Sequence, residues 1–287
     1  MNLIALKNLP TTILGNKKLL LALGLVVILL GGLFLKNYLT PKVDPSAPII
    51  EEELTFDPEG PYVQLLPRND GNALNLTLKR IARYESLAYE LAYTDEEGVS
   101  RGVGDKNTWI KIDQSLGEYE QEVLFGTCSK NVCKYDKGVE NGSLSLWVRL
   151  ENHSYRVVAN WHLQSPESAL GKLVSPDEHL SLTLDPKKHN LALVKFTIIH
   201  DLSGAPKISS DKRFVGKVYT VNTPLSKSLP SGEVKLELAE IPPQDAKIAV
   251  FSESDNKWNE LETKVSGSIL TATAPSGGIF AVLALKN

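Results

Sequence analysis

The feature that most constrains this chain is an unbroken run of apolar and glycine residues from Leu19 to Leu35, flanked by Lys17, Lys18 and Lys36. A helix rises about 1.5 Å per residue, so the run is about long enough to cross a hydrocarbon core of roughly 30 Å. The flanking lysines can extend their ammonium groups to the membrane interfaces. We therefore expect a transmembrane helix over residues 19–36, which places the chain at a membrane.

A cleaved signal peptide is the alternative interpretation of this run. Cleavage needs a short apolar core followed by a small-residue site. The residues from Lys36 to Pro41 offer no such site, and Pro48 directly follows the small pair Ser46-Ala47. We favour an uncleaved signal anchor.

The lysines also predict the orientation of the anchor. Lys7, Lys17 and Lys18 precede the apolar run, whereas the acidic stretch Glu51–Glu53 follows it. Because positive residues are retained in the cytoplasm, we expect residues 1–18 to form a short cytoplasmic N-terminus. The chain is then a single-pass protein of the cell membrane, with its bulk extracytoplasmic and displayed at the cell surface.

Charge narrows the set of partners for this exterior. The formal net charge is −3, and residues 1–36 hold four lysines and no acid, so the remainder carries −3 − 4 = −7. A nucleic-acid-binding face needs a basic surface. We expect no nucleic-acid partner, and we expect the lipid bilayer together with a protein or glycan ligand.

The pattern beyond the anchor divides into a stalk and two β-rich segments. Prolines and acids favour an extended conformation over residues 37–61. Alternation of apolar and polar residues then predicts antiparallel strands, as in Leu144–Leu150 and Tyr155–Leu163. The alternation breaks near Pro166 and Pro176, so we expect one β-sandwich domain at 62–165, a linker at 166–177 and a second β-sandwich domain at 178–287.

The second of these domains contains three segments rich in apolar and turn residues: Trp258–Leu261, Gly267–Ala272 and Gly277–Leu283. On these segments it resembles the immunoglobulin-like modules of bacterial surface proteins. The resemblance implies an immunoglobulin-like fold for this half of the chain and implies no activity.

Cys128 and Cys133 are the two cysteines of the chain, and they lie close together in the sequence. A structural zinc site needs four ligands, and no second pair exists. In an extracytoplasmic domain, two neighbouring cysteines most often form a disulfide. We therefore expect a Cys128–Cys133 bond across a β-hairpin in the first domain.

An enzymatic interpretation of Cys128 is the alternative. The anchor, the β-rich exterior and Leu124–Cys128 resemble a sortase transpeptidase, in which a Thr-Cys nucleophile follows a histidine and precedes an arginine. Thr127-Cys128 matches the nucleophile, and Arg149 or Arg156 could supply the arginine. The first histidine, His153, comes after the cysteine, so the upstream histidine is missing.

The remaining polar residues supply no recognisable catalytic or metal-binding motif. The five histidines form neither H-E-x-x-H nor H-x-H, so we expect no metal and no cofactor. A pair of carboxylates of the glycosidase kind could lie among the many acids, because their separation in space is not readable from sequence.

Trp147 is the residue we single out as a candidate binding surface. It occupies the polar phase of its strand, between Leu146 and Val148. An exposed tryptophan favours a glycan or protein contact, and the alternative is that both faces of this strand are buried. Together these observations predict a membrane-anchored adhesion, ligand-binding or envelope-structural protein with no catalytic residues. An anchored envelope enzyme, sortase-like through Cys128 or carbohydrate-active, is the alternative.

Overall fold

The structure is a computed structural model that describes residues 50–130, 132–165, 171–184, 191, 194–199, 201–224 and 229–286. The predicted cytoplasmic N-terminus and anchor lie outside these residues. Within the described ranges, no helix is both long and apolar enough to cross a bilayer. Ile49–Asn287 form one compact unit.

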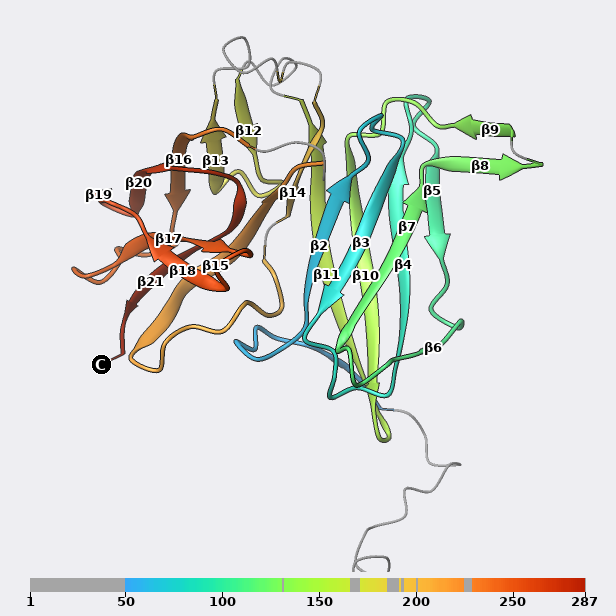
Figure 1. The fold of residues 1–287 in the computed structure, drawn as a ribbon, viewed down its shortest axis with the longest axis horizontal. Coiled ribbons are helices and arrows are strands. Elements are labelled where there is room, and N and C mark those ends of the chain that lie inside the picture. The colour runs from blue at the N-terminus through green and yellow to red at the C-terminus, as the bar shows by residue number, and fades with distance from the viewer. Residues whose placement is uncertain are drawn as a thin grey trace, which may run out of the picture. The chain divides into compact units, whose positions relative to one another are not determined.

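The described part of this unit is built from β-strands and contains no helix, which confirms the predicted all-β class (Figure 1). The strands are β1 (Ile50–Glu53), β2 (Tyr62–Pro67), β3 (Ala73–Lys79), β4 (Ser86–Thr94), β5 (Ser100–Gly104), β6 (Ile110–Lys111), β7 (Glu118–Leu124), β8 (Gly126–Ser129), β9 (Val132–Tyr135), β10 (Asn141–Leu150), β11 (His153–Gln164), β12 (Lys172–Val174), β13 (Leu180–Thr183), β14 (Phe196–Ile199), β15 (Lys212–Asn222), β16 (Gly232–Glu237), β17 (Lys247–Ser252), β18 (Lys257–Glu260), β19 (Thr263–Ser266), β20 (Ile269–Ala274) and β21 (Gly278–Leu285).

These strands form four sheets, and their pairing is antiparallel except between β1 and β11. The largest sheet has eleven strands, with the order β18-β17-β21-β15-β14-β11-β10-β4-β5; β1 and β6 pair beside this path. A three-stranded sheet has the order β2-β3-β7, and a five-stranded sheet has the order β12-β13-β16-β20-β19. The hairpin β8–β9 forms a two-stranded sheet of its own.

Two hydrophobic cores lie against the large sheet. The first core contains side chains from the three-stranded sheet and from β4, β10 and β11, among them Leu65, Leu76, Leu78, Leu146 and Trp161. The second core contains side chains from the five-stranded sheet and from β14, β15, β17 and β21, among them Leu182, Phe196, Leu236, Leu270 and Phe280. Each core therefore lies between the large sheet and one smaller sheet.

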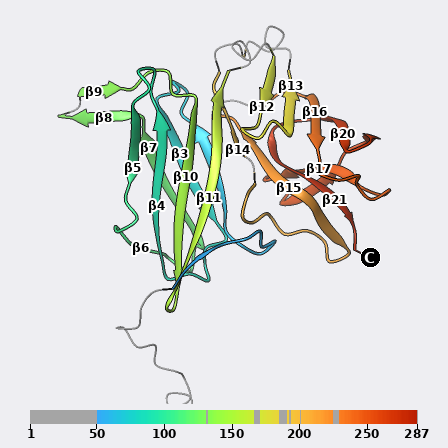
Figure 2. The same cartoon turned by 180° about the vertical axis from the view of Figure 1, so that it is seen from behind.

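Apolar and polar residues alternate in β10 and β11 because one face of these strands is buried, as expected from the sequence. Leu144, Leu146 and Val148 are buried in the first core, and Ser145 on the opposite phase is half-buried. Figure 2 shows β4, β10 and β11 side by side, and the register pairs Leu146 with Tyr89 and Val157. Successive side chains of a strand point to opposite faces, so one face of these strands packs into the first core.

The predicted linker at 166–177 contains a strand, which corrects that boundary. β12 occupies Lys172–Val174 and pairs with β13, and Leu173 is fully buried in the second core. Pro176 follows this strand in a turn, and Pro166 lies outside the described residues. β14 then pairs with β11, so the large sheet is continuous across the predicted boundary.

The predicted stalk is also shorter than expected at its C-terminal end. Ile50–Glu53 form β1, whose residues pair in parallel with His153–Arg156, and the amide of Leu54 donates to the carbonyl of Arg156 at 2.8 Å. The exposed glutamates suggested a solvated segment, but strand pairing uses the backbone and leaves their carboxylates in water. Residues 37–49 of the predicted stalk lie outside the described part of the chain.

Candidate functional site

The candidate site is a cavity of about 460 Å³ where four segments of the chain meet, the last of them at Lys286. Phe56 and Pro58 come from the connection between β1 and β2, and Arg80 directly follows β3. The third segment runs from Lys207 to Phe214, at the start of β15. The volume is within the range of pockets that hold small ligands, roughly 300–1,000 Å³.

An aromatic group forms the apolar part of this cavity. The rings of Phe56 and Phe214 meet edge to face, with centroids 5.4 Å apart. Phe214 packs in turn against Trp258 at 5.7 Å, and the Trp258 Nε1–H donates to the carbonyl of Pro206 at 3.2 Å. Phe56 is 39 % exposed and lines the cavity.

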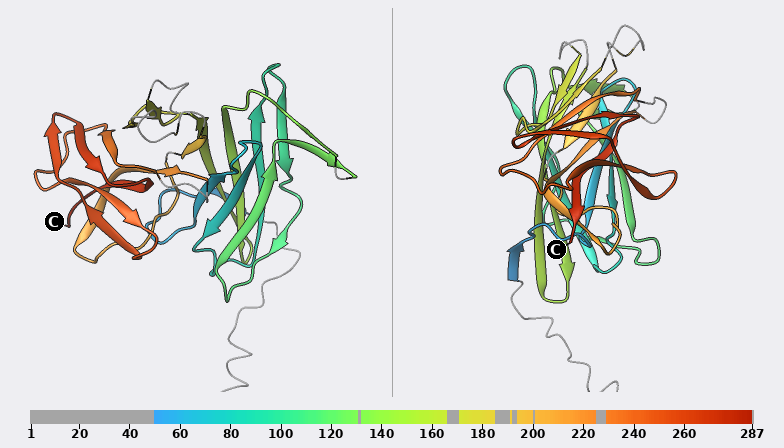
Figure 3. Two further views of the ribbon diagram at one scale, coloured as in Figure 1. Left: turned by 45° about the horizontal axis from the view of Figure 1, so that its top comes forward. Right: turned by 90° about the vertical axis from the view of Figure 1, so that its left-hand side faces the viewer.

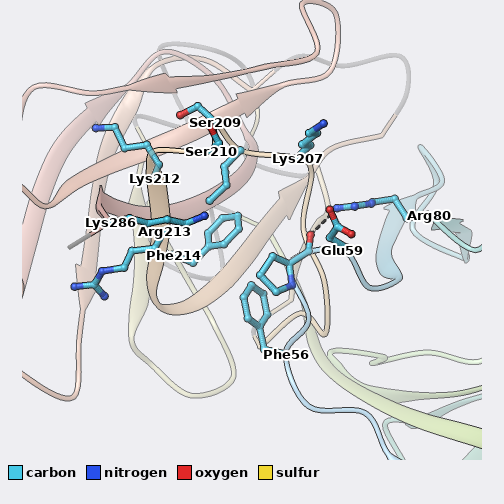
Figure 4. A pocket seen from close by; sticks show the side chains of 12 residues that line it. Phe56, Glu59, Arg80, Lys207, Ser209, Ser210, Lys212, Arg213, Phe214 and Lys286 are labelled. Atoms are coloured by element: carbon cyan, nitrogen blue, oxygen red, sulfur yellow. Dashed lines mark hydrogen bonds between the residues drawn. The ribbon is translucent and has the colours of Figure 1, made fainter.

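Five cationic residues and one carboxylate, Glu59, line the same cavity. The cations are Arg80, Lys207, Lys212, Arg213 and Lys286. Figure 4 shows the phenylalanine rings between two cationic groups, with Arg80 and Lys207 on one side and Lys212, Arg213 and Lys286 on the other.

Two of these cations have structural partners. The Arg80 Nη1 donates to the carbonyls of Pro58 at 2.6 Å and Ala205 at 2.5 Å, and so joins the two walls of the cavity. Lys212 Nζ lies 2.7 Å from Glu260 Oε1. The hydrogen bond between them lowers the pKa of the Glu260 carboxyl and raises the pKa of Lys212, so this pair stays charged at neutral pH.

The other three cations make no ion pair with any described residue: they are Lys207, Arg213 and Lys286. Asp211 and Asp245 lie close enough for nearby cations to contribute to lowering their pKa values. The chief causes of these shifts are hydrogen bonds to Ser209 for Asp211 and to the Leu285 amide for Asp245. Both carboxylates are therefore held by local hydrogen bonds, and the cavity wall keeps an excess of positive charge.

Cys128 and Cys133 lie in the exposed hairpin β8–β9, where they occupy paired positions. A disulfide joins them, as expected from the sequence, with a Cα–Cα distance of 4.1 Å. A thiolate nucleophile requires a free sulfur, so the sortase-like interpretation has no nucleophile while this bond is intact.

The structure corrects the interpretation of Trp147 as a candidate binding surface, because its ring is not exposed. The side chain is only 6 % exposed, although it points away from the first core. Its neighbours across the sheet are Ala88, which is fully buried, and Arg156, whose guanidinium lies 5.8 Å from the ring centroid. Long arginine side chains can cover apolar surface along their stems, which accounts for a buried ring on this face.

The structure brings neither the cysteines nor Trp147 into the cavity. The residues that do line it were missed because Phe56 falls in the predicted stalk and no sequence motif includes Arg80. The available signal was the local basic stretch that ends in Lys212-Arg213-Phe214. Among the described residues, no group of three or more histidine, cysteine or acidic side chains is placed to hold a metal ion. No protein-family model and no curated protein matches the chain.

Proposed function

We propose that this chain is a single-pass, membrane-anchored protein whose extracytoplasmic part binds an anionic glycan in the cavity lined by Phe56 and Phe214. The observation that carries the proposal is the combination of aromatic rings with three cations that have no ion-pair partner among the described residues. Such a protein captures the glycan or adheres to a surface that carries it, and neither function requires a covalent step.

The chemistry of the cavity favours an acidic saccharide over a neutral one. The C–H face of a sugar ring packs on phenylalanine, while a carboxylate or phosphate group can accept from Lys207, Arg213 or Lys286. Arginine offers a planar set of donors that matches a carboxylate, and lysine offers a point charge.

The anchor and the architecture are part of this proposal. The apolar run at 19–36 supports attachment to the membrane, with the bulk of the chain outside the cytoplasm. We also propose that each of the two cores corresponds to one immunoglobulin-like sandwich, with the large sheet shared between them. Protease applied to intact cells should remove the bulk of the chain, and survival of that bulk until the membrane is broken would contradict the orientation.

Binding is tested with a short uronic-acid oligosaccharide and a neutral oligosaccharide of the same backbone. We expect the uronic acid to bind at least tenfold more tightly at low salt, and we expect the difference to shrink as salt increases. The double substitution Lys207→Gln and Lys286→Gln should reduce this affinity about tenfold, and Phe56→Ala should weaken binding of the saccharide at any salt concentration.

The control is the double substitution Lys257→Gln and Lys264→Gln, which removes two exposed lysines elsewhere on the surface. It should leave the affinity unchanged. Equal binding of the two oligosaccharides, or an equal loss in the control, would overturn the assignment of this cavity.

A further inference from the structure

The disulfide hairpin β8–β9 contributes nothing visible to either core. Thr127, Cys128 and Ser129 on β8 are exposed, and Val132 on β9 is 74 % exposed. The hairpin projects away from the three-stranded sheet (Figure 3). An isolated two-stranded hairpin is only marginally stable in water, so the disulfide is what orders this segment.

The base of the hairpin is anchored firmly. Phe125 directly precedes β8, is fully buried and stacks on Trp161, with ring centroids 6.0 Å apart. The amide of Asp136 donates to the carbonyl of Phe125 at 3.0 Å, which closes the base. Arg68 lies over the ring of Tyr135 at 5.6 Å. The base of the hairpin, at Phe125 and Asp136, is therefore held in place, whereas its strands are exposed to solvent.

The exposed strands of the hairpin carry a positive charge. Between Gly126 and Tyr135 the chain carries Lys130 and Lys134 and no acidic residue. Neither lysine forms an ion pair with a described residue. Both strands of the hairpin also have an unpaired edge within the described part of the chain, since β8 and β9 pair only with each other.

The complementary surface lies on the same chain, on the strand that leads into the hairpin. β7 is an edge strand of the three-stranded sheet, and it exposes Glu118, Glu120 and Glu122. Arg68 Nη1 lies 3.2 Å from Glu122 Oε1, whereas Glu118 and Glu120 form no ion pair with any described residue. Acidic side chains on an edge prevent two such edges from pairing with each other, and they favour a strand that carries lysines.

We propose that the hairpin β8–β9 of one copy of this chain docks on the β7 edge of a second copy. The hairpin adds a strand to the three-stranded sheet, and Lys130 and Lys134 lie against Glu118 and Glu120 of the other copy. Each copy carries both surfaces, so two identical contacts close a symmetric dimer. This contact is separate from the cavity and does not depend on its ligand.

The test uses the full chain in detergent and two charge-reversal variants. The first carries Glu118→Lys and Glu120→Lys, and the second carries Lys130→Glu and Lys134→Glu. Sedimentation should show dimers for the wild-type chain and at least tenfold weaker self-association for each variant alone. A mixture of the two variants should recover the dimer, because the basic hairpin of the first meets the acidic edge of the second and the reverse holds for the other contact.

Cross-linking locates the contact. A carbodiimide that joins lysine amines directly to carboxylates should link Lys134 to Glu118 or Glu120 between isotope-labelled and unlabelled chains. The double substitution Cys128→Ala and Cys133→Ala should weaken the dimer and leave the cooperative unfolding transition of the chain in place. The matched control, Lys257→Glu with Lys264→Glu, should still form dimers.

A wild-type chain that stays monomeric would overturn the proposal. Variants that self-associate like the wild-type chain, a mixture that fails to recover the dimer, or cross-links found only within one chain would overturn it as well.

Discussion

Two parts of the large sheet differ in how many faces they bury. In β10 and β11 one face packs into the first core, and the other carries polar residues and the arginine-flanked Trp147. In β21 every residue from Ile279 to Ala284 is buried, with Ile279, Ala281 and Leu283 in the first core and Phe280, Val282 and Ala284 in the second. Alternation of apolar and polar residues therefore indicates a strand with one buried face, and a continuous apolar run indicates a strand with two buried faces.

β2 lies against β14 and β15, and β15 is the neighbour of β21 in the large sheet. The Thr197 hydroxyl on β14 donates to the carbonyl of Leu65 on β2. The Ser203 hydroxyl donates to the carbonyl of Pro61 at 2.8 Å. The three-stranded sheet thus reaches past β11 and covers strands that also carry the second core.

Substitutions at consecutive positions give the sharpest test of this difference. On β21, Ile279→Ala should cost about 2–4 kcal/mol and Phe280→Ala about 3–5 kcal/mol, because both side chains are buried. On β11, Trp161→Ala should cost about 3–5 kcal/mol, whereas its exposed neighbour Asn160→Ala should cost less than about 0.5 kcal/mol. Urea denaturation measures all four, and a loss below about 1 kcal/mol for Ile279→Ala would break the two-face description of β21.

Trp147→Ala tests the outer face of β10, and its effect should be smaller than that of Trp161→Ala. The ring is buried, but it lies outside both cores, and its Nε1 has no hydrogen-bond partner among the described residues. We expect a loss of about 3 kcal/mol, at the lower end of the range for buried aromatic residues. Trp147→Phe, which keeps an aromatic ring, is the control and should retain most of the stability. A loss below about 1 kcal/mol with a change in ligand capture would restore Trp147 as a binding residue.

The smallest expected effect concerns the turn between β2 and β3, outside both cores. A hydrogen bond from Arg68 is the main reason that the pKa of Asp70 is lowered to about 2. A carboxyl with a lowered pKa stabilises the fold above its unfolded pKa near 4, and this stability is lost as the pH falls toward 2. The side chain is 46 % exposed, so solvent screening limits the contribution to less than about 1 kcal/mol.

Asp70→Asn should therefore lower the free energy of unfolding slightly at pH 7 and should flatten its dependence on pH between 4 and 2. Urea denaturation at pH 7 and pH 3 measures this. The exposed residue Asp105 serves as the control, and Asp105→Asn should leave the same interval of the pH profile unchanged. An unaltered pH dependence of the free energy of unfolding in Asp70→Asn would show that solvent screens the Arg68 contact so fully that it does not stabilise the fold.

Local pattern alone predicted the β class, many of the strands and the hairpin disulfide. Apolar and polar residues alternate in Leu144–Leu150 because one face of this strand is buried in a core. Cys128 and Cys133 are close because a short turn joins their strands. The apolar run at 19–36 likewise predicts an anchor from local composition, although it lies outside the described residues.

Only the tertiary structure decided how these strands meet. The pairing of β14 with β11 made one sheet out of two predicted sandwich domains, and neither strand encodes its partner in its own periodicity. Trp147 has the phase of an exposed residue, but it is buried in the folded chain, where Arg156 from the next strand lies near its ring. The candidate cavity joins Phe56, Arg80 and Phe214, which no spacing rule relates, because side chains so far apart in sequence come together only when the sheets pack.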